Sequence, residues 1–165
     1  MTAHRGSFPL TRRLLLEGGT LVALAGVGPV LPVARATSAA ADDRYPEAAF
    51  NQKDGNEAIR LLYDGQLAEP SDRIKLDAPE IAENGAVVPV SVTTTLADVT
   101  SIALVVPENP NPLAACYRLP PGTMPSVAGR LKMAKTSAIV AIVEAGGKLF
   151  STSREVKVTV GGCGG

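Results

Sequence analysis

The scarcity of several residue types narrows the functions open to this chain. Its 165 residues include no tryptophan, one histidine, two cysteines and only 4% aromatic residues. Basic and acidic side chains number 16 each, so the chain lacks the basic surplus that supplies most of the affinity of a nucleic-acid-binding protein. At 45% hydrophobic residues it is nevertheless too apolar to be disordered. The composition indicates one globular domain that does not bind nucleic acid.

The single histidine, His4, lies near the N-terminus, ahead of the region expected to fold. The folded domain therefore cannot use Ser-His-Asp or Cys-His catalysis, and it lacks the commonest zinc ligand. The two cysteines, Cys116 and Cys163, are 47 positions apart, which matches no zinc-binding spacing. We expect neither a metal site nor a bound cofactor.

Residues 1–36 have the pattern of an export signal. Arg12 and Arg13 directly precede an apolar stretch that is interrupted by glycines and prolines, which weaken a membrane-spanning helix. The stretch ends in Val33-Ala34-Arg35-Ala36, the small-x-small pattern of a signal peptidase site. We predict a twin-arginine signal cleaved after Ala36, with a Sec signal, a retained anchor or cleavage a few residues later as alternatives. The mature protein is expected in the periplasm, without stable membrane association.

The 129 residues after the predicted cleavage site carry 12 basic and 15 acidic groups, a net charge of about −3. Residues 37–160 are predicted to form the folded domain, beginning with an Ala-rich polar lead over 37–43. The pattern over residues 46–64 predicts one or two short helices, the second capped by Asp54 or Asn56. Gly65 ends the helical pattern, and Pro70-Ser71 is predicted to be a connector.

From residue 72 onward the sequence is typical of β-structure. Val88, Val90, Val92 and Thr94 alternate with other residues and are predicted to share one face of a strand. Six to eight short strands, at intervals of roughly ten residues, predict a mainly β fold: an immunoglobulin-like β-sandwich with one or two short N-terminal helices. The predicted strands are residues 73–76, 88–94, 99–106, 113–119, 127–133, 136–143 and 148–160, the last of which could be two strands split near Arg154.

Prolines and glycines mark the predicted boundaries of these strands. Glu83-Asn84-Gly85 predicts a turn, and the proline-rich segment over 107–112 predicts an irregular loop. Pro89 lies inside the strand predicted over 88–94 and has no N–H to donate to a neighbouring strand. This strand is therefore expected at the edge of a sheet.

The chain ends in a thiol between glycines. After the alternating residues up to Val160, the last five residues are Gly161, Gly162, Cys163, Gly164 and Gly165. Glycine adopts positive and negative φ about equally, so residues 161–165 are predicted to form a flexible arm that reaches roughly 17 Å. A phosphate-binding glycine loop is a weaker interpretation, because such loops join a strand to a helix and no helix follows here. With no histidine to act as a base, the thiol is suited to entering another protein's active site rather than to catalysis of its own.

Cys116 lies in a different setting. It stands in the apolar strand predicted over 113–119, where a small buried thiol is the simplest interpretation. The alternative is a disulfide with Cys163, which the periplasm would permit and which would tie down the arm.

Three segments of the chain resemble the SoxY family, the sulfur carriers of thiosulfate oxidation. They are the tail Val158-Thr159-Val160-Gly161-Gly162-Cys163-Gly164-Gly165, residues 76–90, and Glu108-Asn109-Pro110-Asn111-Pro112. The resemblance implies an immunoglobulin-like sandwich that forms a heterodimer with a second sandwich protein, SoxZ. It also implies that Cys163 is the covalent attachment point for sulfur intermediates. Cys116 departs from the family pattern, in which the tail cysteine is usually the only one.

The resemblance also implies a set of partner enzymes. The haem cytochrome SoxAX would join thiosulfate oxidatively to Cys163, the di-manganese hydrolase SoxB would release sulfate, and, where present, the sulfane dehydrogenase SoxCD would oxidise the remaining sulfur. The carrier itself would not be an enzyme. Two other functions are weighed against it: an exported structural or interaction module whose tail cysteine forms an intermolecular disulfide, and a thiol enzyme.

Overall fold

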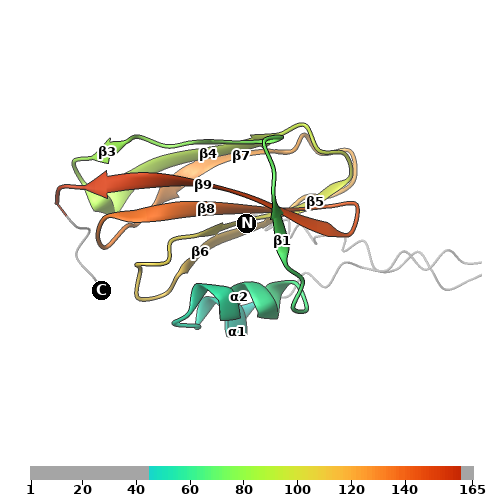
Figure 1. The fold of residues 1–165 in the computed structure, drawn as a ribbon, viewed down its shortest axis with the longest axis horizontal. Helices are drawn as coiled ribbons and strands as arrows, with labels where there is room; N and C mark the ends of the chain where they lie inside the picture. The colour runs from blue at the N-terminus through green and yellow to red at the C-terminus, as the bar shows by residue number, and fades with distance from the viewer. Residues whose placement is uncertain (1–44, 161–165) are drawn as a thin grey trace, which may run out of the picture. The chain divides into compact units, whose positions relative to one another are not determined.

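The computed structural model describes residues 45–160, which form two short helices followed by a two-sheet sandwich (Figure 1). This is the mainly β architecture that the sequence predicts. The helices are α1 (Glu47–Phe50) and α2 (Gly55–Leu62), and the strands of the described region are β1 (Ala68–Pro70), β2 (Ile74–Asp77), β3 (Ile81–Ala82), β4 (Val88–Thr94), β5 (Val99–Val105), β6 (Leu113–Arg118), β7 (Ser126–Leu131), β8 (Ser137–Ala145) and β9 (Lys148–Val158), with a 3-10 turn, η1 (Gly85–Val87), before β4.

The predicted export signal (1–36), the lead (37–43) and the arm (161–165) lie outside the described residues. Their boundaries therefore stay predictions. Within residues 45–160, neither helix has the length and apolar character needed to span a membrane.

The two helices form where the sequence places them. The side chain of Asp54 accepts a hydrogen bond of 2.9 Å from the backbone N–H of Glu57, so the predicted cap of α2 is confirmed and is Asp54. Beyond the helix, Gly65 adopts a φ of +79°, a conformation that glycine reaches without the cost of a Cβ. Buried residues of both helices pack with buried residues of β5, β6, β8 and β9, so the helices cover part of the outer face of that sheet.

The larger sheet has the order β1-β9-β8-β5-β6, with β3 also paired to β9, and the smaller sheet has the order β2-β4-β7. Strand β9 pairs antiparallel with β8 over residues Lys148 to Val156 and parallel with both β1 and β3. It runs without interruption through Arg154, so the split considered from the sequence does not occur. Hydrophobic side chains of both sheets, among them Val92, Ile102 and Ile139, fill the space between them.

The edge position predicted for the proline-containing strand is wrong. Strand β4 lies between β2 and β7, with Pro89 opposite Arg130 of β7. The proline is tolerated because β2 ends at Asp77, opposite Ser91. No residue of β2 therefore pairs with β4 at Pro89. Its neighbours Val88 and Val90 are buried in the core, as the alternation predicts.

Pro70 was also predicted incorrectly, as part of a connector. It is the last residue of β1 and pairs with Ser151 of β9. Strand β1 lies at one end of the sheet order, and an edge strand needs fewer backbone donors than a central one. The next residue, Ser71, donates its N–H to the carbonyl of Ser151 at 2.9 Å.

Candidate functional site

The candidate thiol, Cys163, lies outside the described residues, as do Gly161, Gly162, Gly164 and Gly165. The structure does describe the residues that carry this segment, as far as Val160 (Figure 1). The site is therefore built from the end of β9 and from the loops that contact it.

Backbone hydrogen bonds hold the end of β9 on one side. The N–H of Lys157 donates to the carbonyl of Glu80 at 2.9 Å, and the N–H of Thr159 donates to Ala82 at 3.1 Å. The carbonyl of Val160 then accepts from the N–H of Gly85 at 2.9 Å. The pairing thus continues past β9 itself, to the last residue described.

A side-chain contact holds the same end of β9 on its other side. The hydroxyl of Thr136 accepts a hydrogen bond of 3.0 Å from the N–H of Val158. Because both sides are bonded, residues 157–160 have a defined direction relative to the sandwich. The predicted arm therefore begins from a fixed base.

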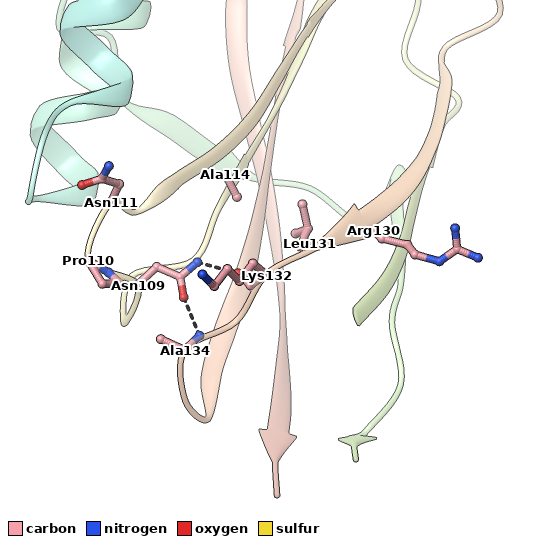
Figure 2. Close-up of a pocket in the computed structure, with 8 residues that line it drawn as sticks. All are labelled: Asn109, Pro110, Asn111, Ala114, Arg130, Leu131, Lys132 and Ala134. Carbon is pink, nitrogen blue, oxygen red and sulfur yellow. Dashed lines mark hydrogen bonds between the residues drawn. The ribbon is translucent and has the colours of Figure 1, made fainter. Parts of the chain in front are cut away.

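A pocket of about 280 Å³ lies in the loops at this end of the sandwich (Figure 2). Both polar atoms of the Asn109 side chain bond to the backbone of another loop that lines this pocket. Nδ2 donates to the carbonyl of Lys132 at 2.6 Å, and Oδ1 accepts from the N–H of Ala134 at 2.9 Å. The proline-rich segment that carries part of the family resemblance thus contributes to this pocket. Its lining residues are Asn109, Pro110, Asn111, Ala114, Arg130, Leu131, Lys132 and Ala134.

The charged side chains of the pocket lining are both cationic. Arg130 and Lys132 are exposed, and the described part of the chain shows no ion pair for either, whereas neighbouring Lys135 lies 2.6 Å from Glu108. Figure 2 shows the Arg130 side chain extending away from the Asn109 loop. The lining includes no carboxylate, histidine or thiol. Its two cations favour anions nearby, with a strength that salt reduces.

Cys116, on β6, is less buried than the sequence predicts. It pairs with Ala103 of β5 and is half-buried, because β6 is an edge strand of its sheet. Burial raises the pKa of its thiol, nearby Arg118 opposes that rise and Glu144 adds to it, so the reactive thiolate is disfavoured. Its thiol is free in the described structure, and the alternative disulfide involves a residue outside that range.

Three polar side chains near Cys116, those of Tyr63, Ser101 and Glu144, form a hydrogen-bonded group that no local sequence pattern predicts. Tyr63, only 6% exposed, is hydrogen-bonded through its hydroxyl to Ser101 Oγ at 3.1 Å, and the Ser101 hydroxyl donates to the Glu144 carboxylate at 2.9 Å. Tyr63 directly follows α2 as its C-cap, and Ser101 and Glu144 lie in β5 and β8. Burial raises the pKa of Tyr63, and the hydrogen bond with Ser101 only partly offsets that rise. No group of three or more His, Cys, Asp or Glu suited to a metal ion occurs within residues 45–160.

Replacing Tyr63 by phenylalanine should weaken the loss of stability at alkaline pH. Because the folded state raises the pKa of Tyr63, the unfolded chain releases this proton first as pH increases. The contribution of the neutral Tyr63 phenol to the free energy of unfolding is complete below the ordinary tyrosine pKa near 10. Above that pH it is lost, by up to about 1.4 kcal/mol per pH unit. Urea unfolding between about pH 9 and pH 11 should give a shallower fall of stability for Tyr63→Phe, with a difference in slope that grows toward about one proton at the upper end of this range. Tyr45→Phe, which removes an exposed phenol, is the control, and identical slopes for all three chains would contradict the prediction.

A family model described as sulfur oxidation protein SoxY matches residues 59–163 of the chain. The chain belongs to the SoxY family. The match begins in α2 and extends through the sandwich to Cys163. The resemblance stated from the sequence is therefore confirmed, as is the immunoglobulin-like sandwich.

Among solved structures, the sulfur carrier protein SoxY from Chlorobium limicola f thiosulfatophilum is 42% identical to this SoxY-family chain. The likeness covers 68% of this chain and 97% of that one, with a TM-score of 0.60. Two superoxide reductase (neelaredoxin) structures from Ignicoccus hospitalis are 24% and 21% identical, cover 52% and 55% of this chain and 78% and 94% of theirs, and have TM-scores of 0.47 and 0.49. That likeness is too distant to bear on function. The comparison with curated proteins gives no match.

Proposed function

We propose that this protein is a periplasmic sulfur carrier that holds thiosulfate-derived intermediates covalently on Cys163 and presents them to partner Sox enzymes. The observation that carries the proposal is the extent of the SoxY match, which ends at Cys163, three residues beyond the hydrogen-bonded Val160. The sulfur carrier SoxY of Chlorobium limicola, 42% identical, supports the same role. The protein would be a substrate carrier and not an enzyme.

The residues at the end of β9 suit a carrier because they combine a fixed base with a short arm. Val160 is bonded to Gly85, and the chain from Val160 to Cys163 can span at most about 11 Å. Two glycines occupy that span, and glycine adopts the widest range of backbone angles. A partner enzyme that docks against the sandwich would therefore receive the thiol within a small, defined volume.

The proposed chemistry takes place on sulfur. Loading joins the Cys163 sulfur to the outer sulfur of thiosulfate, which forms an S–S bond, releases the thiol proton and gives two electrons to the SoxAX cytochrome. Hydrolysis by SoxB then cleaves the bond between the outer sulfur and the sulfonate, and water supplies the fourth oxygen of the released sulfate. The sulfane sulfur stays on Cys163 for SoxCD, where that enzyme is present. The carrier supplies only the attachment atom and its placement.

A heterodimer with SoxZ is part of the proposal. Strand β6 ends one sheet order and β7 ends the other, so each has one side without a strand partner in the described chain. Such edges bind other chains by adding a strand. Ala114 and Ala115 of β6 are uncharged and half-buried, which favours a protein neighbour over open solvent.

Intact mass measurement tests the carrier function. The full chain, purified with SoxZ and incubated with thiosulfate, SoxAX and an electron acceptor, should gain the mass of one S₂O₃ group. Peptide mapping should place that group on Cys163, and addition of SoxB should reduce it to a single sulfur. The same mixture without SoxAX is the control.

Other outcomes would favour the alternatives. Dimer mass without any sulfur adduct would support a structural module with an intermolecular disulfide. Consumption of thiosulfate by the purified chain alone would support a thiol enzyme. An adduct found only on Cys116 would refute the assignment of Cys163.

A further inference from the structure

We propose that Asn109 is a positioning residue that sets the direction in which the Cys163 arm leaves the sandwich. The side-chain hydrogen bonds of Asn109 go to Lys132 and Ala134 rather than to β9, so it acts through the loop that contains Met133 and the turn that contains Gly85. The inference rests on the proposed function only in taking Cys163 as the residue that carries sulfur. The geometry itself is complete within the described residues.

The first link joins Asn109 to the loop between β7 and β8. Its amide nitrogen donates to the carbonyl of Lys132 at 2.6 Å, and its amide oxygen accepts from the N–H of Ala134 at 2.9 Å (Figure 2). One side chain thus binds both residues that flank Met133. Asparagine suits this position because its side chain ends in a donor and an acceptor together.

The second link joins Met133 to the base of the arm. The N–H of Met133 donates to the carbonyl of Gly85 at 2.7 Å, and the N–H of Gly85 donates to the carbonyl of Val160 at 2.9 Å. The side chain of Met133 is fully buried, so the loop is fixed on its core side as well. These hydrogen bonds, joined through the backbone of residues 132–134 and of Gly85, therefore connect Asn109 to the last described residue of the chain.

Asn109 is itself held in place by its own loop. Its N–H donates to the carbonyl of Val106 at 3.0 Å. The N–H of Val106 in turn donates to the carbonyl of Pro112 at 2.8 Å, so the two ends of the loop are bonded to each other. The prolines of this loop have φ fixed near −65°, which limits the conformations open to the backbone around Asn109. The side chain is thus presented from a rigid loop, as a residue that positions another segment requires.

A change of direction at Val160 displaces the whole volume that the flexible arm can reach. With a span of at most about 11 Å, a turn of roughly 30° at the base would move the centre of that volume by up to about 6 Å. Catalytic groups tolerate far smaller errors, since a misplacement of about 1 Å can cost on the order of a hundredfold in rate. Residues that fix the base should therefore affect enzymatic transfer more than they affect the stability of the fold.

The test compares Asn109→Ala and Asn109→Asp with Asn111→Ala in the full chain purified with SoxZ. Asn111 lies in the same loop, where its side chain accepts a hydrogen bond from Lys53. Asn111→Ala therefore removes the same polar amide as Asn109→Ala but leaves the hydrogen bonds to residues 132–134 in place. The aspartate variant keeps an acceptor for Ala134 but places a carboxylate against the carbonyl of Lys132. It should therefore behave at least as poorly as the alanine variant.

Hydrogen exchange gives a readout that does not depend on sulfur chemistry. In Asn109→Ala the amides of Gly85, Met133 and Ala134 should exchange about tenfold faster, while amides within β8 stay unchanged. The rate constant kcat/KM for enzymatic steps on the Cys163 adduct should fall about tenfold or more, whereas reaction of Cys163 with a small soluble thiol reagent should not change. Asn111→Ala should match the wild type in all three measurements.

Unchanged exchange at Gly85 would overturn the inference, and so would faster exchange combined with normal enzymatic transfer. If the alanine variant does not fold, Asn109→Gln, which keeps both polar atoms on a longer stem, is measured in its place by the same criteria. Failure of the wild-type chain to load sulfur would instead refute the proposed function, and the exchange data would still decide whether Asn109 holds the base of the arm.

Discussion

Replacement of Cys163 by serine should abolish thiosulfate-dependent electron release in a mixture reconstituted with SoxZ, SoxAX and SoxB. Serine cannot form the S–S bond on which loading depends, so the expected loss is complete rather than partial. Thermal unfolding should not change, because the buried core is formed by residues of the sandwich, whose last strand ends at Val158. Electron transfer to the cytochrome and intact mass measure the two parts of this prediction.

Cys116→Ala is the matched control for that result. Burial raises the pKa of the Cys116 thiol, and the residue lies on β6, away from the hydrogen-bonded end of β9. The variant should keep most of its activity and lose about 1 kcal/mol of stability or less, as expected for a half-buried side chain that becomes smaller. An inactive Cys116→Ala beside an active Cys163→Ser would reverse the roles assigned to the two thiols.

Replacement of both Gly161 and Gly162 by proline should reduce enzymatic turnover on the order of a hundredfold, the scale expected when a reacting group is misplaced by about 1 Å. Proline fixes φ near −65° and favours an extended chain, so the thiol could no longer adopt different geometries in different active sites. Alanine at both positions should give an intermediate defect, because a Cβ restricts φ less than a ring does. Steady-state rates with each partner enzyme measure the effect.

The proline variant should react with a small thiol reagent as fast as the wild type, and its unfolding temperature should be unchanged. These two controls separate a defect of presentation from a defect of chemistry or folding. Equal turnover of the wild-type and proline chains would show that the glycines do not act through flexibility.

The sequence predicts the elements of this fold well where the pattern is local. The alternation at Val88, Val90 and Val92 corresponds to a buried strand face, and Asp54 caps α2 as expected. It fails where the outcome depends on a neighbour that is distant along the chain. Pro89 is compatible with a central strand only because β2 stops short of it, and Cys116 is half-exposed because no strand within residues 45–160 pairs with the outer side of β6.

The candidate site is predictable in part. A cysteine between glycines is a local signal, and so is the segment that contains Asn109. The series of hydrogen bonds from Asn109 through Met133 and Gly85 to Val160 is not predictable, because it joins four distant parts of the chain. Three of these parts take part through backbone atoms, which every residue has. For the same reason Tyr63, Ser101 and Glu144 give no sign in the sequence that they meet.

The two-sided pairing of β9 has a mechanical consequence for the proposed carrier function, in which partner enzymes bind the C-terminal segment. Strand β9 is bonded to β8 along one side and to β1 and β3 along the other. A pull on the C-terminus along the strand axis would load many of these bonds at once, in shear, rather than break them one after another from the end. A partner enzyme that binds the thiol and then dissociates could therefore pull on the C-terminal segment without separating β9 from its neighbouring strands.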